Sequence, residues 1–197
     1  MAATHALPPA PPLQRPRVLV VGSAFASAAA VMIFVGLIGI YLAERANAIA
    51  AGEKWLPSEI SIPLQQPNTI LFTLLMSVVT MAWAVQAVAN NDKVNSYLAL
   101  GVTAVFGFST IVMTTYLWSL MGADVAANTQ SVLLYTITGA HMVMTILAII
   151  FVGLMAFRAL AGGFSARQHD GITAAALFWY AMVAVYALIW ITIYVTK

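Results

Sequence analysis

The stretch VLVVGSAFASAAAVMIFVGLIGIYLA, residues 18–43, contains no charged side chain in 26 consecutive positions. A helix of about 20 apolar residues is long enough to cross the hydrocarbon core of a bilayer. The apolar core of a cleavable signal peptide has only about 7–15 residues, so this stretch is too long to be one. It therefore predicts a retained transmembrane helix.

Four more stretches of the chain are long, apolar and free of Asp, Glu, Lys and Arg. A membrane β-barrel would instead need alternating segments of about ten residues, and the sequence has none. We therefore expect an all-α bundle of five transmembrane helices, with spans at about 18–43, 68–90, 96–121, 131–157 and 171–196. Residues 1–17 carry five prolines and predict a separate extended tail, whereas 18–197 form the membrane domain.

The composition excludes several classes of protein. Hydrophobic residues make up 62% of the chain and charged residues 7%, whereas the surface of a soluble domain needs about 25% charged residues. The net charge of +2 is too small and too scattered to indicate binding of nucleic acid. Without any cysteine, the chain has no disulfide, thiolate nucleophile or iron–sulfur ligand.

The basic residues predict the orientation of the bundle. Five of the eight Lys and Arg residues fall in the N-terminal tail or in the connections on its side of the membrane, and three fall on the other side. Because cytoplasmic loops carry an excess of positive charge, we expect the N-terminus in the cytoplasm and the C-terminus outside. Five aromatic residues near the span ends are candidate interfacial anchors: Tyr41, Tyr97, Trp118, Trp190 and Tyr194.

The turn at residues 90–92 reads Asn-Asn-Asp, which is typical of a tight connection. Such a short turn makes the second and third helices antiparallel neighbours.

Within the five spans, His141 is the single side chain of the Asp, Glu, Lys, Arg and His group. Proton pumps and transporters usually carry several such groups at membrane depth, so a proton relay within this chain is disfavoured. Imidazole is also a common haem ligand. The favoured interpretation of His141 is nevertheless a hydrogen bond between helices or a contact with a partner subunit, and we expect no metal or cofactor site in this chain.

Small residues follow one side of the first helix at Gly22, Ala26, Ala30 and Gly36. Small side chains let the backbones of two helices approach closely, so this stripe predicts a packing surface. The sequence leaves open whether the stripe packs within the chain or against a partner.

Polar side chains in the second and third helices are the next candidates. We expect Gln86, Thr114 and Tyr116 to make polar contacts between helices. Together with Thr110 they are also the only candidates for a channel lining, although threonine hydroxyls commonly bond to carbonyls of their own helix. The sequence contains no phosphate-binding glycine loop, paired carboxylates, HExxH motif or nucleophile–base arrangement, so we expect no catalytic residue.

Four segments carry a recognisable series of motifs: IFVGLIGIYLAER (33–45), LQQPNTILFTLLMSVVTM (64–81), YTITGAHMVMTILAIIFV (135–152) and FWYAMVAVYALIWITIYV (178–195). In this order they resemble subunit III of haem–copper oxidases in its short five-helix form. The similarity runs from about Val18 to the C-terminus. The second segment is similar to the Pro-Asn-Thr start of a family helix, and the third is similar to the family's Thr-Gly-x-His segment.

The chain also departs from the family at ionisable positions. The family's intramembrane glutamate aligns with Ala30, the glutamate of a Tyr-Glu pair with Leu117, and the second histidine of His-x-x-His with Met144. The Trp-His-Phe-Val-Asp run of the last helix reads WYAMV at 179–183. The resemblance therefore implies scaffold and assembly roles, without the family's roles in proton uptake.

The resemblance implies a non-catalytic, structural and assembly subunit of a respiratory haem–copper oxidase complex. It implies that the catalytic partner subunit holds the haem and copper, and that phospholipid binds to the bundle. The alternatives are an accessory subunit of a nitric-oxide reductase-type complex, a stand-alone transporter or channel, and a membrane enzyme with haem or quinone at His141. The short form and the absence of a transit peptide predict a multi-pass protein of a bacterial inner membrane.

Overall fold

The computed structural model describes residues 17–55, 62–122, 125, 128–160 and 170–196 of the chain. Its elements are α1 (Val18–Ala50), α2 (Gln65–Ala89), α3 (Lys93–Met121), α4 (Thr129–Leu160), α5 (Asp170–Ile189) and the π-helical turn η1 (Trp190–Val195), which continues α5. Each of the five long helices is apolar enough to cross a membrane. The predicted all-α bundle with five transmembrane helices is confirmed. The proline-rich part of the tail, residues 1–16, lies outside the described residues.

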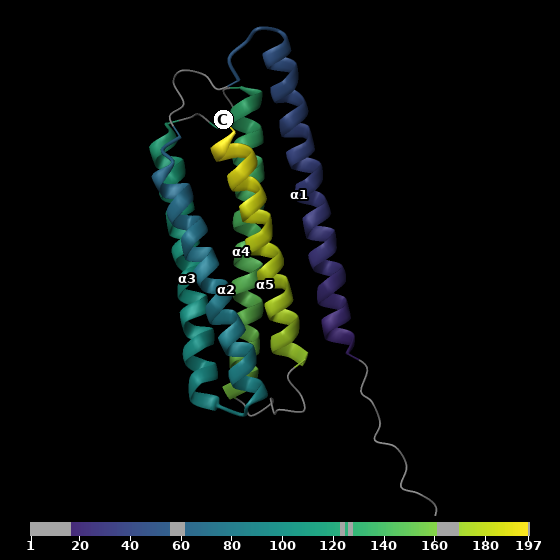
Figure 1. Ribbon diagram of the computed structural model, residues 1–197, viewed down its shortest axis with the longest axis vertical. Coiled ribbons are helices and arrows are strands. Elements are labelled where there is room, and N and C mark those ends of the chain that lie inside the picture. The colour runs from purple at the N-terminus through teal and green to yellow at the C-terminus, as the bar shows by residue number, and fades with distance from the viewer. Residues whose placement is uncertain (1–16, 56–61, 123–124, 126–127, 161–169, 197) are drawn as a thin grey trace, which may run out of the picture.

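The helices are arranged around α5 (Figure 1). Helices α2, α3, α4 and α5 form a ring in which each contacts the next and α5 closes onto α2. Helix α1 lies outside this ring, mainly against α5 and with a smaller contact to α4. As a result α5 is the most buried of the five helices, and α1 is the least buried.

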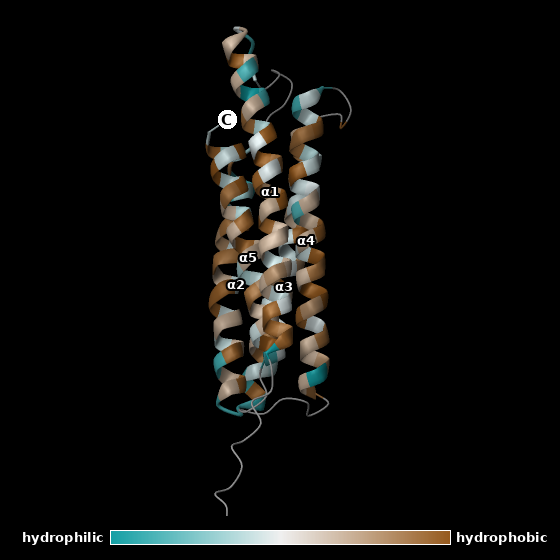
Figure 2. Ribbon diagram, turned by 90° about the vertical axis from the view of Figure 1, so that its right-hand side faces the viewer, coloured by the Kyte–Doolittle hydropathy of each residue, from teal (hydrophilic) through white to brown (hydrophobic). Residues whose placement is uncertain are grey.

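Hydrophobic residues predominate along most of the length of the helices, and hydrophilic residues are more frequent toward the two ends of the bundle (Figure 2). Every long helix exposes large apolar residues; examples are Phe25 on α1, Phe72 on α2, Phe108 on α3 and Phe157 on α4. An exposed apolar belt of this extent would be unfavourable in water, but it suits the hydrocarbon of a bilayer.

Helix α1 is longer than the span predicted from the sequence, because it runs seven residues beyond residue 43, to Ala50. These residues include Glu44, Arg45 and several alanines, which are good helix formers in water. At 1.5 Å per residue a helix of 33 residues is about 50 Å long, well above the roughly 30 Å of the hydrocarbon core. The helix therefore continues past the end of its apolar stretch.

Beyond α1 the chain turns back at Gly52, whose φ of +77° is a conformation that glycine adopts without strain. This return places Trp55 against α1, where its Nε1 donates a hydrogen bond of 2.9 Å to the Tyr41 hydroxyl. Tyr41 is only 1% exposed, and so is Tyr194. The expectation that these two tyrosines are interfacial anchors is therefore wrong, because both face the interior of the bundle.

The predicted antiparallel pairing of α2 and α3 is confirmed. Asn91 adopts a left-handed conformation in the turn, with φ 56°. Asp92 then caps α3, because its Oδ1 accepts the backbone N–H of Asn95 at 3.1 Å and its Oδ2 accepts the Asn95 side-chain amide at 2.5 Å. These bonds, the side-chain one first, lower the pKa of Asp92 below its usual value.

Candidate functional site

The most polar part of the interior surrounds His141 in α4. The ring is 3% exposed, and its Nε2 lies 3.2 Å from the carbonyl oxygen of Met182 in α5. Since a carbonyl can only accept, Nε2 carries the hydrogen of this bond. Phe34 of α1 contacts the ring edge-on at 6.2 Å between centroids, and the Tyr186 ring of α5 lies at 5.2 Å. His141 thus sits where α1, α4 and α5 meet.

A small void lies beside His141 and has a volume of about 10 Å³. Its lining residues come from α3, α4, α5 and η1, and they are Thr114, Thr138, His141, Tyr186, Ile189 and Tyr194. A single water needs about 10–15 Å³ measured in this way. The void is therefore far too small for a haem or a quinone ring. In the described part of the chain, no group of three or more His, Cys, Asp or Glu side chains is placed to hold a metal ion.

Two hydrogen bonds tie the end of α5 and the start of η1 to the first turn of α2. The Tyr186 hydroxyl donates to the carbonyl oxygen of Pro67 at 3.1 Å, and Trp190 Nε1 donates to Asn68 Oδ1 at 2.8 Å. Tyr186 and Trp190 are four residues apart, which places them on one side of the helix. Pro67 is tolerated here because the first turn of a helix has no partner for the missing N–H. The Pro-Asn pair that marked this segment in the sequence therefore serves as the anchor point for α5.

Trp179 fills the centre of the ring, where it is fully buried. Its Nε1 donates to Ser77 Oγ on α2 at 2.9 Å. On α3, a Cβ atom added at Gly107 would lie 2.9 Å from Trp179 Cη2 and 2.7 Å from Ile149 Cγ1. Because real Cβ contacts are never this short, glycine is the residue that fits at position 107.

Sequence reasoning missed Gly107 and Ser77, which both contact Trp179. A glycine in the middle of a helix costs about 1 kcal/mol relative to alanine, so Gly107 was a signal for close packing. The chain has other glycines within its helices, however, and Gly101 on the same helix has open space around it. Gly107 differs from Gly101 only in the tertiary structure, where side chains of α4 and α5 lie against Gly107.

The small-residue stripe predicted on α1 faces away from the bundle. Gly22, Ala26 and Gly36 are exposed, and a Cβ atom added at either glycine would meet nothing within 4 Å. Ala30 lies at the edge of this face and packs partly against the core. Its role as a partner interface remains a prediction.

A different side of α1 packs on the ring. Its buried residues are Ser23, Ser27, Phe34, Ile38 and Tyr41. The Ser23 hydroxyl donates to the carbonyl oxygen of Ala174 in α5 at 2.6 Å, so small residues do allow close approach there. These serines stand one position after Gly22 and Ala26, which rotates them by about 100° around the helix.

The three polar residues predicted to contact other helices have different surroundings. Gln86 and Tyr116 are exposed, Gln86 near the end of α2 and Tyr116 near the end of α3. Thr114 is buried beside the void, and its hydroxyl donates to the carbonyl oxygen of Thr110 at 2.8 Å. Thr110 in turn donates to Phe106, so the interpretation that these threonines bond to their own helix is confirmed. The four residues considered for a channel do not line one common path.

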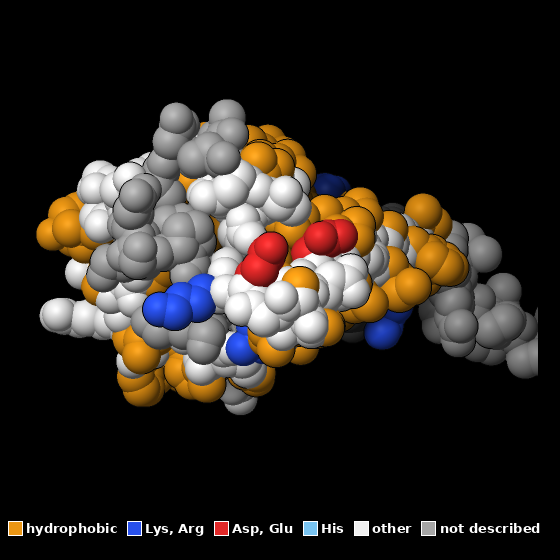
Figure 3. Space-filling model, turned by 90° about the horizontal axis from the view of Figure 1, so that it is seen from above, with side chains coloured by type: hydrophobic (Ala, Val, Ile, Leu, Met, Phe, Trp, Pro, Cys, Tyr) orange, Lys and Arg blue, Asp and Glu red, His pale blue; other side chains and the backbone are white. Residues whose placement is uncertain are grey.

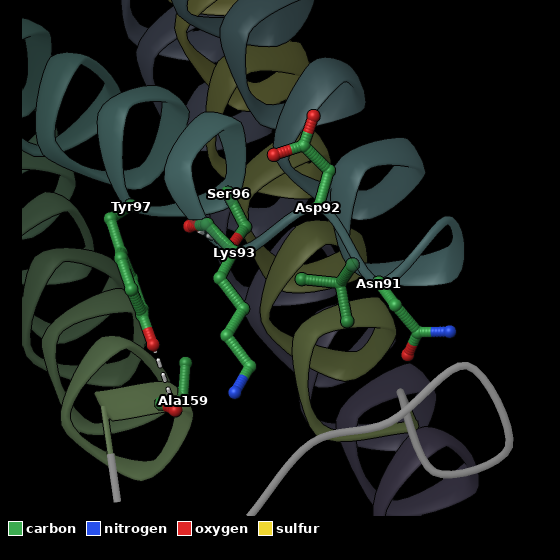
Figure 4. Close-up of a pocket in the computed structure, with 7 residues that line it drawn as sticks. Asn91, Asp92, Lys93, Ser96, Tyr97 and Ala159 are labelled. Carbon is green, nitrogen blue, oxygen red and sulfur yellow. Dashed lines mark hydrogen bonds between the residues drawn. The ribbon is translucent and has the colours of Figure 1, made fainter. Parts of the chain in front are cut away.

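The end of the bundle that holds the start of α1 has a small pocket of about 40 Å³ between the α2–α3 turn and the end of α4 (Figure 4). In it the Tyr97 hydroxyl donates to the carbonyl oxygen of Ala159 at 3.1 Å, which joins α3 to α4. Lys93 also lines this pocket and is exposed. The arrangement is a polar cap at the end of the apolar belt.

The opposite end carries charged side chains between apolar and uncharged ones (Figure 3). A shallow cleft of about 320 Å³ there is lined by Glu44, Asn47, Glu53, Trp55 and Gln130, among others. Nearby, the Arg45 guanidinium donates to the carbonyl oxygen of Thr196, after the last turn of α5. A cation at this position interacts favourably with the negative end of the helix dipole. This end therefore also joins α1 to α5.

Comparison with known proteins agrees with this architecture. The family model described as cytochrome c oxidase subunit III matches residues 17–197. A cytochrome c oxidase subunit 3 from Spodoptera frugiperda is 28% identical over 71% of this chain and 97% of its own length. Proteins of the same name from Drosophila yakuba and Pylaiella littoralis are 28% and 29% identical over 75% and 73% of this chain.

The alignments cover 57% of the Drosophila yakuba protein and 53% of the Pylaiella littoralis protein, so the chain spans little more than half the length of these two relatives. The family match, by contrast, extends over all five helices. The resemblance inferred from the four sequence segments is thereby confirmed. The chain belongs to the cytochrome c oxidase subunit III family.

Proposed function

We propose that this chain is a non-catalytic, structural subunit of a haem–copper oxidase complex in aerobic electron transport. Its membership of the subunit III family over residues 17–197 is the observation that carries the proposal. The packing of the interior supports it, because the void at His141 holds no more than a water-sized group. In this proposal the catalytic partner subunit holds the haem and copper.

The outer face of α1 is the surface that we assign to the partner. Gly22, Ala26 and Gly36 are exposed there without neighbours from their own chain, and Ala30 borders them. In lipid, helices associate through close packing of small residues and not through the hydrophobic effect. A partner helix could therefore approach α1 more closely here than at a face covered by large side chains.

Phospholipid is the second expected partner. A hollow of about 380 Å³ lies on the outside of α3 and is lined by Tyr97, Leu98, Gly101, Val102 and Val105. Gly101 leaves this hollow open, and its apolar walls suit an acyl chain. Lys93 stands one turn away at the end of the helix, where its ammonium group can pair with a lipid phosphate.

For the orientation we propose a cytoplasmic N-terminus in a cell membrane. Arg17, Lys93 and Arg158 gather at the end of the bundle that holds the start of α1, and this excess of basic residues supports the assignment. The relatives named above come from eukaryotes, so the bacterial origin remains a prediction.

Gentle detergent extraction with an affinity tag on this chain tests the proposed function. We expect larger membrane polypeptides to co-purify, together with a haem absorption spectrum and bound copper, and oxygen consumption in the presence of an electron donor. Recovery of a colourless, copper-free chain from membranes that contain an active haem–copper oxidase would contradict the proposal.

A further inference from the structure

We propose that the void beside His141 is a binding site for one ordered water molecule, which joins α3, α4 and α5 in the interior of the apolar bundle. Its volume of about 10 Å³ matches one water, and five of its six lining side chains are polar. The inference does not depend on the proposed function, because it rests on the geometry of this chain alone.

The hydrogen-bond roles of the lining groups favour a ligand that donates. Thr114 and Thr138 already donate their hydroxyl hydrogens to the carbonyl oxygens of Thr110 and Leu134, at 2.8 and 2.7 Å. Tyr186 donates to Pro67. Each of these oxygens keeps a lone pair with which it can accept another bond.

His141 also contributes a hydrogen-bond acceptor to the lining. Because Nε2 donates to Met182, Nδ1 of the neutral ring carries no hydrogen and can only accept. The lining is therefore rich in acceptors. Among the described residues, the Tyr194 hydroxyl is the one lining hydroxyl that donates no hydrogen bond. A water molecule supplies two O–H donors to such a lining and can accept one hydrogen bond from Tyr194.

A metal cation would also meet oxygen acceptors here, but it does not suit this site. The lining contains no carboxylate, and an ion without a charged partner at membrane depth costs several kcal/mol. The lining also supplies only four side-chain oxygens, from Thr114, Thr138, Tyr186 and Tyr194, whereas a cation such as Ca²⁺ takes six or more oxygen ligands. Water satisfies the same acceptors without this penalty.

The π-helical turn contributes to the site. Ile189 is the last α-helical residue of α5, and Tyr194 belongs to η1, yet both line the void. Short π-helical segments are often found at functional sites, because the wider turn changes the direction of its side chains. Here the turn brings the Tyr194 side chain, which is 1% exposed, to the same void as His141.

The test is a structure of the full chain, in whatever complex it is purified with, at a resolution that shows ordered waters. We expect one density peak in the void, within about 3.2 Å of at least two of its oxygen or nitrogen atoms. A void without density, or one closed by a rotated side chain, would overturn the proposal.

A pair of threonine variants tests the site in a second way. Thr114→Val keeps the shape of the side chain but removes an acceptor from the void, whereas Thr110→Val removes a hydroxyl one turn away that does not line it. We expect Thr114→Val to weaken or remove the water peak and to lower the Tm by about 2 °C more than Thr110→Val does. Identical Tm values together with an unchanged peak would contradict the assignment of Thr114 as a water ligand.

Discussion

Helices α1 and α5 have similarly apolar sequences but opposite environments. Helix α5 contacts α1, α2 and α4 and is the most buried helix, whereas α1 touches only one side of the ring. Three aromatic residues of α5 and η1 have hydrogen-bond partners on α2: Trp179 with Ser77, Tyr186 with Pro67 and Trp190 with Asn68. The difference teaches that hydropathy identifies a membrane helix without telling whether lipid or protein surrounds it.

The largest expected effect is a loss of stability that differs between a variant on α5 and a variant on α1. Trp179→Ala on α5 should remove about 3–5 kcal/mol of stability, because it leaves a large cavity and removes the hydrogen bond to Ser77. The matched control on α1 is Phe25→Ala, since Phe25 is 73% exposed and should change the stability little. Thermal unfolding of the detergent-solubilised protein measures both. Equal losses of stability would mean that α5 is not the central helix.

A pair of glycine variants on α3 tests how closely α3 packs against Trp179 of α5. Gly107→Ala should cost about 1–3 kcal/mol, because the new methyl group collides with Trp179 and Ile149. Gly101→Ala lies on the same helix in open space, and it should be neutral or stabilising by up to about 1 kcal/mol. The Tm of each variant gives the answer, and a neutral Gly107→Ala would disprove the close contact.

For variants on the exposed face of α1, we expect an effect on assembly with the partner subunit and little effect on stability. Ala26→Leu should leave the Tm of the isolated chain within about 2 °C, since Ala26 is exposed, but it should reduce recovery of the partner in a tagged purification. Ala28→Leu is the control, because Ala28 is also exposed but lies about 200° around the helix from Ala26. If both variants recover the partner as well as the original chain does, the stripe is not the interface.

The smallest effect is expected outside both helices, at the α2–α3 turn. The pKa of Asp92 is lowered in the folded state, so its contribution to stability is present above the unfolded pKa of about 3.9 and is lost as pH falls through the lower folded pKa. Asp92→Asn removes this dependence while keeping a good helix cap. The Tm difference between the two proteins should therefore shrink between pH 6 and pH 3. A difference that grows as the pH falls would contradict the assignment.

Much of the fold could be predicted from the apolar stretches alone, because a backbone in lipid must satisfy its hydrogen bonds within each helix. The ends of the helices were less predictable, as the extension of α1 to Ala50 shows. The candidate site was predicted only in part. His141 was recognisable as an isolated ionisable group, whereas Tyr186, Ser77 and Gly107 gave no signal that distinguished them from similar residues nearby.

By itself, the sequence determined that the chain crosses the membrane five times, that its family is subunit III of haem–copper oxidases, and that its spans contain one histidine and no acid. These properties follow from the residues of each segment and from their order along the chain. Only the tertiary structure decided that α5 is central, that the α1 stripe faces outward, and that Tyr186, Tyr194 and Thr114 meet at His141. Such facts depend on the rotation of each helix about its axis. All sides of an apolar helix are equally compatible with lipid, so hydropathy does not set this rotation. Packing against neighbouring helices sets it instead.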